Sequence, residues 1–236
     1  MIDFEVMRSK AAAFGVNLTE SQLNMLDTYA EMLVDWNSRV NLTAITDNEG
    51  IMTRHFEDSI ALLSVAEIPP NSSIIDIGTG AGFPGMVLKI VRPDIELTLL
   101  DSLNKRILFL DEVAKKINVK VNTLHLRAEE GGKSTKYREK YDIACARAVA
   151  NLRELSEYCL PYVSIGGKFI ALKGPDVQEE VNSAKAGIGT LGGMVDSVRK
   201  LTLSDGSGRS IVNVSKIKNT PPQFPRSYAK ISKKPL

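Results

Sequence analysis

The sequence predicts an α/β protein: a mostly parallel β-sheet with helices on both faces, preceded by a helical segment and closed by an antiparallel hairpin. From Ser72 onward, short β-branched runs alternate with longer helical patterns, which is typical of βαβ units with right-handed crossovers. Before that point, apolar residues at helical spacing dominate. The last two strand-like runs are joined by a glycine-rich turn, which favours an antiparallel pair.

The composition fits one large globular domain, or one domain with a small appendage. Of the 236 residues, 43% are hydrophobic and 25% are charged, and the formal net charge is +2. These values argue against disorder and neither require nor exclude a nucleic-acid partner. The two cysteines form neither a metal-ligand pattern nor a disulfide framework. No signal peptide and no stretch of roughly 18 apolar residues is evident. We expect a cytoplasmic protein, with no metal and no membrane partner, and nothing requires more than a monomer.

Residues 1–67 are expected to form an N-terminal helical segment. Thr19 and Gln22 have the spacing of a capping box at the start of a helix. The segment "IPPNSS" then combines two prolines with turn residues, so we place a boundary there and expect the α/β domain over 68–236. The apolar positions that predict the two main helices are Leu23, Leu26, Ala30, Leu33 and Trp36, followed by Ile51, Phe56, Ile60 and Leu63.

Strands and helices alternate after this boundary. The expected parallel strands are "SIIDIG", "IELTLLD", "VKVNTLHL", "YDIACAR" and "GGKFIALKG", with helices near 84–92, 104–117 and 151–163. The closing pair is "MVDSVRKLTL" and "RSIVNVSKI" around "SDGSG". The proline-rich tail from Asn219 is expected to be irregular.

A glycine-rich loop follows the first expected strand. Gly78, Gly80, Gly82 and Gly85 fall within eight residues, and the last three match G-x-G-x-x-G. That motif is a weak signal alone, but a strand before it and a helix after it are the context in which it binds a nucleotide-bearing ligand. Each glycine costs backbone entropy, so a purely structural loop is the less favoured alternative.

Asp76 and Pro84 favour one ligand class over another. A carboxylate at the strand end would face a pyrophosphate unfavourably, whereas it suits a ligand that carries an ammonium and a sulfonium. Pro84 removes a backbone N–H from the start of the helix, where the phosphates of a dinucleotide would seek donors. Both observations favour S-adenosylmethionine as the cofactor over NAD.

Asp101 ends the second expected strand, 25 residues after Asp76 (101 − 76). An acid at this position can accept hydrogen bonds from ribose hydroxyls, or it can cap the following helix, and it can do both. An antiparallel pair at the end of such a sheet is the methyltransferase version of the fold, which supports S-adenosylmethionine further.

Many segments together resemble one family. They are "WNSRVNLTAIT", "RHFEDS", "DIGTGAGFPG", "TLLDSLNKR", "RAEE", "ARAVANL", "GGKFIALKG", "TPPQFPR" and "KKPL". In this order, from about residue 20 to the end, they are similar to RsmG (GidB), the bacterial 16S rRNA guanine-N7 methyltransferases. The resemblance implies a Rossmann-like class I S-adenosylmethionine-dependent fold. It also implies methyl transfer to N7 of one guanosine in 16S rRNA, within the small ribosomal subunit or an assembly intermediate.

The resemblance also assigns cofactor-binding residues. Gly78 and Phe83 of the loop correspond to cofactor contacts, Ala128 and Glu129 would flank the adenine, and Arg147 would complete the site. Asp76, Gly80 and Asp101 fit the general methyltransferase pattern. A cysteine stands two residues before Arg147 where serine is more familiar, which puts little in doubt.

The expected chemistry requires no catalytic base. Guanine N7 has an in-plane lone pair and no proton, so it can attack the methyl carbon directly once the two groups are aligned. We therefore assign no residue as catalytic. His55 and His125 are not expected to act as bases, and Cys145 is expected to be a buried structural residue.

RNA contacts are harder to identify. Arg147 could hold the cofactor, a phosphate of the acceptor nucleotide, or both, and an ordinary surface ion pair is the alternative. Lys105, Arg106, Lys173 and Arg209 are candidate RNA-binding residues, although each by itself resembles a solvated surface charge. Three rival functions stay open: a methyltransferase for a small molecule or a protein, an NAD-dependent oxidoreductase, and an RNA-binding module with a vestigial cofactor loop.

Overall fold

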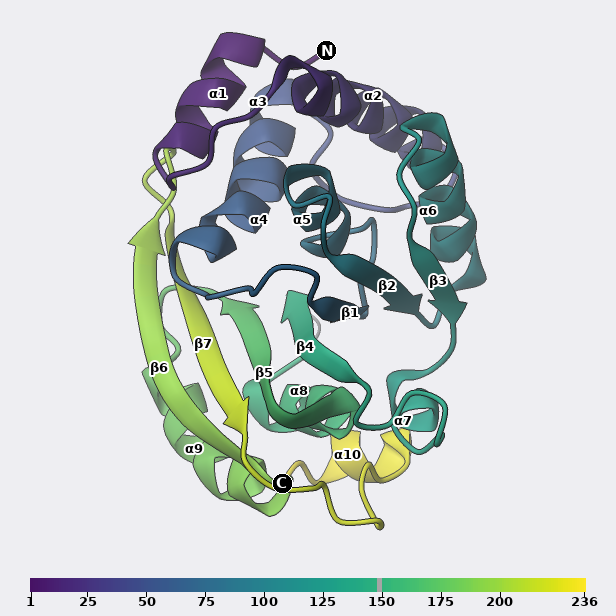
Figure 1. Cartoon of the computed structure of the whole chain (residues 1–236), viewed down its shortest axis with the longest axis vertical. Coiled ribbons are helices and arrows are strands. Elements are labelled where there is room, and N and C mark those ends of the chain that lie inside the picture. The colour runs from purple at the N-terminus through teal and green to yellow at the C-terminus, as the bar shows by residue number, and fades with distance from the viewer. Residues whose placement is uncertain (148–149) are drawn as a thin grey trace.

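The computed structural model describes residues 1–147 and 150–236. Among these residues, a seven-stranded sheet has the order β3-β2-β1-β4-β5-β7-β6. Strands β1 to β5 pair in parallel, and β7 runs antiparallel to both β5 and β6. The predicted parallel sheet with a closing hairpin is confirmed (Figure 1). The strands are β1 (Ser73–Ile77), β2 (Glu96–Asp101), β3 (Asn122–His125), β4 (Tyr141–Arg147), β5 (Val163–Lys173), β6 (Gly193–Thr202) and β7 (Gly208–Lys216).

The helical elements lie before, between and after the strands. Those of the N-terminal segment are α1 (Phe4–Ala12), α2 (Glu20–Asn37), α3 (Asn48–Gly50), the π-helix η1 (Ile51–Glu57), α4 (Asp58–Ala61) and the 3₁₀ turn η2 (Leu62–Ser64). The others are α5 (Gly85–Val91), α6 (Asn104–Lys116), α7 (Ala128–Gly131), α8 (Leu152–Cys159), η3 (Leu160–Tyr162), α9 (Gln178–Thr190) and α10 (Tyr228–Lys233). None of the described helices is long and apolar enough to cross a membrane.

The capping box predicted for α2 is present. The Oγ1 atom of Thr19 accepts from the Gln22 N–H at 3.3 Å, and the Gln22 side chain accepts from the Thr19 N–H at 2.9 Å. The buried residues of α2 include Leu23, Leu26 and Leu33 at helical spacing. The sequence therefore identifies both the start and the inner face of this helix.

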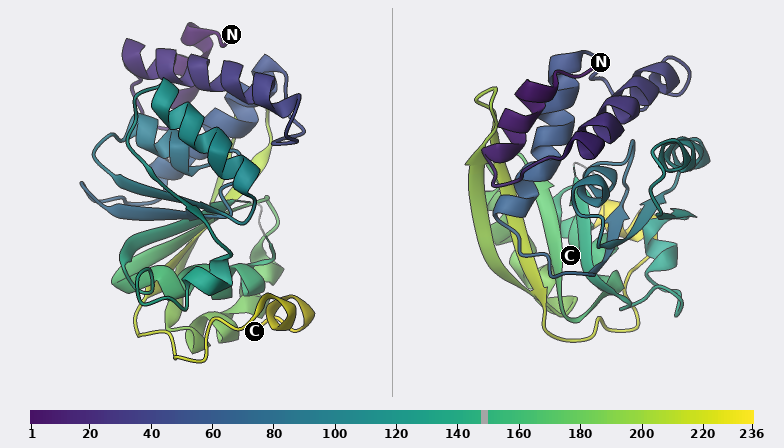
Figure 2. Two further views of the ribbon diagram at one scale, coloured as in Figure 1. Left: turned by 90° about the vertical axis from the view of Figure 1, so that its right-hand side faces the viewer. Right: turned by 45° about the horizontal axis from the view of Figure 1, so that its top comes forward.

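Helices cover both faces of the sheet (Figure 2), and a hydrophobic core lies on each face. The N-terminal helices share one core with α5, α6 and one face of the strands, in which Leu26 and Leu33 pack with Leu99 and Leu110. Helices α8 and α9 cover the other face. Because the N-terminal segment contributes to the core of the sheet, the division into 1–67 and 68–236 stays a prediction about folding units.

The hairpin β6–β7 returns to the N-terminal helices. Lys10 of α1 is buried, and its ammonium donates to Glu49 at 2.9 Å and to Thr53 at 2.8 Å. Glu57 of η1 is also buried and accepts from the Ser204 N–H at 2.7 Å, in the loop between β6 and β7. These contacts hold the N-terminal helices against the far end of the sheet.

The C-terminal tail differs from its expected irregular form, because it contains the helix α10. Prolines remove N–H donors but leave carbonyl oxygens. The Arg138 side chain donates to the carbonyl oxygens of Thr220, Pro221 and Phe224 in this tail. The carboxylate of Glu157, fully buried, accepts from both the backbone and the side chain of Arg226. Arginine contacts from distant segments thus order a tail whose own sequence signals only turns.

Candidate functional site

The candidate functional residues gather at the carboxyl ends of the parallel strands, the edge where open α/β sheets bind ligands. A cavity of about 370 Å³ lies beside the loop between β1 and α5, and we call it the loop cavity. It is lined by Leu42, Thr43, His55, Gly78, Thr79, Gly80, Ala81, Phe83, Asp101, Ser102, Arg106 and Arg147.

The loop uses its own N–H groups to hold its shape. Gly78 and Gly80 have φ angles of 68° and 62°, a left-handed conformation that favours glycine. The N–H groups of Gly78 and Thr79 donate to the Leu100 carbonyl at 2.8 and 3.0 Å, and the Gly80 N–H donates to Asp101 at 3.0 Å. Those of Gly82 and Phe83 donate to Thr79. These donors are therefore not directed at the cavity.

Asp76 lies beneath the loop and is fully buried. Its Oδ2 accepts from the Thr79 hydroxyl at 2.7 Å and from the Gly85 N–H at 2.9 Å. Burial raises the pKa of Asp76 to about 6. Its Oδ1 has no hydrogen-bond partner among the described residues. Asp76 does not line the loop cavity, and its bonds to Thr79 and Gly85 hold the loop from beneath.

Asp101 stands in the wall of the loop cavity, as expected for a ligand contact, and also at the start of α6. Its Oδ1 accepts from the Leu103 N–H at 2.9 Å, and its Oδ2 accepts from Arg106 at 3.1 Å. Arg106 is a candidate RNA contact by sequence, but here it is paired with Asp101 inside the cavity. The negative charge of Asp101 is therefore balanced by the guanidinium of Arg106.

Aromatic stacking fixes one wall. The His55 ring stacks on Phe83 at 4.3 Å between centroids and an interplanar angle of 15°. Phe83 also stacks on Tyr29 at 5.4 Å, and the Arg147 guanidinium lies 4.9 Å from the Phe83 ring centroid. Phe83, predicted as a cofactor contact, is only 4% exposed and forms the base on which two polar side chains rest.

His55 is neutral at physiological pH. Burial and the charge of Arg147 lower the pKa of His55 to about 3. Its Nδ1 lies 3.2 Å from Nη2 of Arg147, and its Nε2 lies 2.9 Å from the Thr43 hydroxyl. Nδ1 also lies 3.2 Å from the Arg54 carbonyl oxygen, so this ring atom is held between a guanidinium and a carbonyl group. That His55 does not act as a general base stays a prediction.

A narrow cavity of about 130 Å³ adjoins the loop cavity, and Gly78 and Ser102 line both. Ala128 and Glu129 stand in its wall beside apolar side chains of three strands' ends. Tyr158, which is not among the residues predicted from the sequence, also lines it. The full lining is Ile77, Gly78, Leu100, Ser102, Leu126, Arg127, Ala128, Glu129, Tyr158 and Tyr228.

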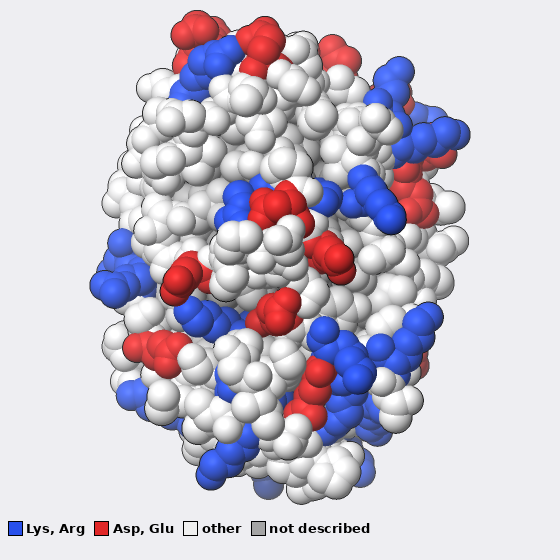
Figure 3. Space-filling view, in the orientation of Figure 1, with Lys and Arg blue, Asp and Glu red and all other residues white. Residues whose placement is uncertain are grey.

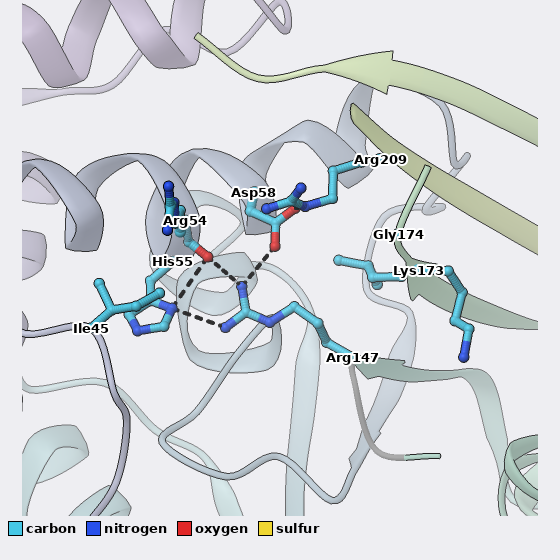
Figure 4. A pocket seen from close by; sticks show the side chains of 9 residues that line it. Ile45, Arg54, His55, Asp58, Arg147, Lys173, Gly174 and Arg209 are labelled. Carbon is cyan, nitrogen blue, oxygen red and sulfur yellow. Dashed lines mark hydrogen bonds and ion pairs between the residues drawn. The ribbon is translucent and has the colours of Figure 1, made fainter. Parts of the chain in front are cut away.

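A third cavity of about 390 Å³ adjoins the loop cavity (Figure 4). His55 and Arg147 line both cavities. We call it the arginine cavity. Its lining is Ile45, Arg54, His55, Asp58, Arg147, Leu172, Lys173, Gly174 and Arg209. Arg54 and His55 come from the π-helix η1, an irregular helical turn of the kind found frequently at functional sites.

One carboxylate joins two strands in the arginine cavity. Asp58 accepts from Nη1 of Arg147 at 2.9 Å and from Nε of Arg209 at 2.9 Å. The Lys173 ammonium instead donates to the Ala150 carbonyl at 2.8 Å and pairs with Glu180 at 2.6 Å, so it turns out of the cavity (Figure 4). Arg147 and Arg209 are therefore the arginines most directly fixed at this site.

The structure brings together most of the residues predicted from the sequence, but not all. Lys105 is exposed and lines none of the three cavities. Sequence reasoning missed Thr43, Arg54 and Asp58, although the quoted segments "WNSRVNLTAIT" and "RHFEDS" contain them. For Arg54 and Asp58 the available signal was their charge within a helix whose neighbouring apolar residues predict burial. Ala148 and Val149, inside the quoted "ARAVANL", lie outside the described residues.

Solved structures with low sequence identity share the fold. Precorrin-6y C5,15-methyltransferase from Geobacter metallireducens matches with a TM-score of 0.52 and 16% identity, over 73% of this chain and 90% of that chain. A 16S rRNA adenine-N(1)-methyltransferase from Catenulisporales acidiphilia matches with a TM-score of 0.51 and 13% identity, over 67% and 88%. The predicted Rossmann-like class I methyltransferase fold is confirmed.

Sequence comparison reaches further. Residues 22–210 match the model of the GidB family, described as rRNA small subunit methyltransferase G. Ribosomal RNA small subunit methyltransferase G from Clostridium novyi is 47% identical over 237 residues, covering 100% of this chain and 98% of that protein. The protein of the same description from Clostridium perfringens is 46% identical over 235 residues, covering 99% and 98%. The chain therefore belongs to the GidB family, the rRNA small subunit methyltransferase G proteins.

Proposed function

We propose that the protein transfers the methyl group of S-adenosylmethionine to N7 of a guanosine in 16S rRNA of the small ribosomal subunit. The observation that supports this most is the succession of three adjoining cavities. Gly78 and Ser102 join the narrow cavity to the loop cavity, and His55 and Arg147 join the loop cavity to the arginine cavity. S-adenosylmethionine has an adenine at one end and a reactive methyl group near the other. It would extend from the narrow cavity into the loop cavity, with the acceptor nucleotide in the arginine cavity.

The loop fits a cationic cofactor better than a dinucleotide. A pyrophosphate binds free backbone N–H groups, whereas those of Gly78, Thr79 and Gly80 already donate within the protein. Asp76 keeps a buried carboxylate oxygen that has no partner among the described residues, and a nearby positive charge would stabilise its ionised form. The donor set at this loop thus argues against NAD and for S-adenosylmethionine.

The narrow cavity suits the adenine, and Asp101 suits the ribose. Ala128 and Glu129 border the narrow cavity, in agreement with the role expected from the family resemblance. Asp101 lines the loop cavity close to Gly78 and Ser102, which belong to both cavities. Each carboxylate oxygen of Asp101 can accept more than one hydrogen bond, so its bonds to Leu103 and Arg106 leave room for ribose hydroxyls.

The arginine cavity suits an acceptor nucleotide. Arg54, Arg147 and Arg209 line it, and Asp58 is the one carboxylate among its lining residues, so the cavity favours anions. On the face shown in Figure 3, acidic and basic side chains are otherwise interspersed, with basic ones densest at the lower right, over α7 and α10. The arginine cavity thus offers RNA phosphates guanidinium groups at the proposed acceptor site itself.

The reaction requires alignment rather than proton transfer. When bound, S-adenosylmethionine supplies an electrophilic methyl group on a sulfonium sulfur. Guanine N7 has a lone pair and no proton, so the residues of this chain need only hold the two reactants in line. The neutral His55 and the Arg147 guanidinium, both resting on Phe83, form a rigid wall between the two reactant cavities. We assign positioning to these residues and a general base to none.

Incubation with labelled S-adenosylmethionine tests the proposal. Unmodified small subunits, assembly intermediates and free 16S rRNA are supplied separately, and the methylated base is mapped. We expect one N7-methylguanosine in 16S rRNA, and the comparison of the three substrates identifies the preferred partner. Methylation confined to a small molecule or a protein would contradict the proposed substrate. Calorimetric binding of NAD, with none for S-adenosylmethionine, would contradict the proposed cofactor.

A further inference from the structure

The Asp58 carboxylate lies between two guanidinium groups from different parts of the fold (Figure 4). Its Oδ2 accepts from Arg147 Nη1 and its Oδ1 from Arg209 Nε, both at 2.9 Å. Asp58 begins α4, Arg147 ends β4, and Arg209 lies at the start of β7. Its side chain is 7% exposed, so this pairing is shielded from solvent on most sides.

Further contacts fix the orientation of each arginine. Arg147 Nη1 also donates to the Arg54 carbonyl at 3.0 Å, while its Nη2 lies 3.2 Å from His55 Nδ1. Arg209 Nη1 donates to the Gly208 carbonyl at 2.9 Å. Because a guanidinium is a planar fork, two bonds of this kind determine where its remaining N–H groups point. Asp58 contributes one such bond to each arginine.

The charge of Asp58 acts against RNA affinity. The carboxylate stands in the wall of a cavity that also contains Arg54, Arg147 and Arg209, and it repels a phosphate that would bind there. A cavity selected only for affinity would not contain this charge. Its presence is explained if the orientation of the two guanidinium groups matters more than the strength of RNA binding.

We propose that Asp58 is a positioning residue for methyl transfer, which orients Arg147 and Arg209 toward the phosphates of the acceptor nucleotide and weakens RNA binding as a consequence. This inference rests on the proposed function. It predicts that kcat and RNA affinity change in opposite directions when the charge is removed. A merely structural role predicts that both decrease together, because a loosened cavity would bind and react less well.

Asp58→Asn tests the proposal with little change in size. The amide oxygen can still accept from one arginine, but the NH₂ group faces the other guanidinium without an acceptor. We expect kcat on small subunits to fall about 10- to 100-fold, the cost typical of misplaced reactants. We expect the Kd for 16S rRNA to decrease about two- to fivefold at low salt, with a steeper salt dependence. A circular dichroism melt checks that the variant is folded at the assay temperature.

Asp58→Glu separates geometry from charge. It keeps the carboxylate and moves its oxygens by one methylene, so kcat should fall while the Kd for RNA stays within about twofold of the wild type. This variant also keeps the test decisive if Asp58→Asn does not fold. An unchanged kcat in a folded variant, or a loss of RNA affinity in parallel with kcat, would overturn the proposal.

Asp205→Asn is the matched control for charge. Asp205 pairs with Arg54 at 3.3 Å and contacts neither Arg147 nor Arg209. Removing its charge should strengthen RNA binding slightly at low salt and leave kcat unchanged. Wild-type turnover on small subunits tests the proposed function by itself, so its failure is distinguishable from a failure of the inference about Asp58.

Discussion

Asp76 and Asp101 show how two carboxylates beside one loop acquire different roles. Asp101 faces the loop cavity and accepts from Leu103 and Arg106, so its charge is balanced. Asp76 is fully enclosed, and burial raises its pKa to about 6. The bonds from Thr79 and Gly85 favour its ionised form but do not offset the burial. The protonation of Asp76 therefore responds to whatever charge enters the cavity above it.

The first prediction concerns the pH dependence of cofactor binding. S-adenosylmethionine carries a net positive charge, so it favours the ionised form of Asp76 and lowers its pKa from about 6. Affinity should therefore be full above pH 7 and decrease as pH falls through 6. A single linked proton changes the affinity by up to about tenfold per pH unit. Calorimetric titration between pH 5 and 7 measures this change.

Asp76→Asn provides the control for that measurement. The amide cannot ionise, so its affinity should be weaker at pH 7 and nearly constant down to pH 5. Its oxygen can still accept from the Gly85 N–H, which keeps the loop in place. A wild-type affinity that does not change between pH 5 and 7 would contradict the assignment, as would the same decrease in the variant.

The sequence predicts individual site residues best where one local segment determines their position. Gly78 and Gly80 line the loop cavity because the strand–loop–helix pattern places them there. The preference of the site for a cationic ligand was also predicted from the negative charge of Asp76. The burial of Asp76 could not be predicted, since it depends on how α5 and β2 pack around this residue. Asp58 was missed for a related reason: its partners lie 89 and 151 residues further along the chain.

At the level of elements, Gly85 determines how closely α5 approaches the sheet. A Cβ atom built at Gly85 would lie 2.7 Å from Leu99 Cδ2 and 2.8 Å from Asp76 Oδ2. No ordinary carbon contact is that short, so α5 can pack here only with glycine as its first residue. The same close approach lets the Gly85 N–H reach Asp76.

We predict that Gly85→Ala moves α5 away from β1 and β2. The overpacking should lower the free energy of unfolding by about 1–3 kcal/mol. The affinity for S-adenosylmethionine should fall too, because the Gly85 N–H moves away from Asp76. Chemical denaturation and calorimetry measure the two effects.

Gly189→Ala in α9 is the matched control. A Cβ there meets no atom within 4 Å, and alanine favours the helix by about 0.5–1 kcal/mol. The two substitutions should therefore change stability in opposite directions. A stabilising effect of Gly85→Ala would show that the helix can shift without cost.

Elements with a strong periodic pattern were predicted correctly, and those fixed by distant contacts were not. The β-branched runs gave β1, β2, β4 and the closing hairpin, and the capping box gave the start of α2. The π-helical turn η1 has no sequence signal of its own, since its apolar residues also fit an α-helix. Helix α10 escaped prediction because Arg138 and Glu157, far away in sequence, anchor the tail that precedes it.

At the scale of the whole molecule, the arginine cavity exists only where three parts of the chain meet. The N-terminal helices supply Arg54 and Asp58, the parallel strands supply Arg147, and the hairpin supplies Arg209. The buried contact of Lys10 with Glu57, and of Glu57 with Ser204, joins the first part to the third. The π-helix η1 carries both Glu57, which makes these contacts, and Arg54, which lines the arginine cavity. We therefore expect the contacts of Glu57 to affect the position of Arg54.

Lys10→Met tests this connection. The substitution leaves the Glu57 carboxylate, 1% exposed, without its buried cation. Breaking a buried ion pair in this way costs about 3–5 kcal/mol, and each kcal/mol lowers the Tm of a chain this long by about 2–4 °C. Because the displaced η1 also carries Arg54 and the hairpin carries Arg209, methyl transfer should decrease at temperatures well below the new Tm.

The double variant Lys10→Met with Glu57→Gln distinguishes an unpaired charge from lost packing. The glutamine is neutral and can still accept from the Ser204 N–H, so we expect it to restore a large part of both Tm and turnover. Arg39→Met, which removes a surface pair with Asp35 in which both side chains are more than half exposed, should change stability by less than about 1 kcal/mol. Thermal denaturation and turnover on small subunits are measured for all three. If the double variant is no more stable or active than Lys10→Met alone, the uncompensated charge of Glu57 is not what connects the helices, the hairpin and the cavity.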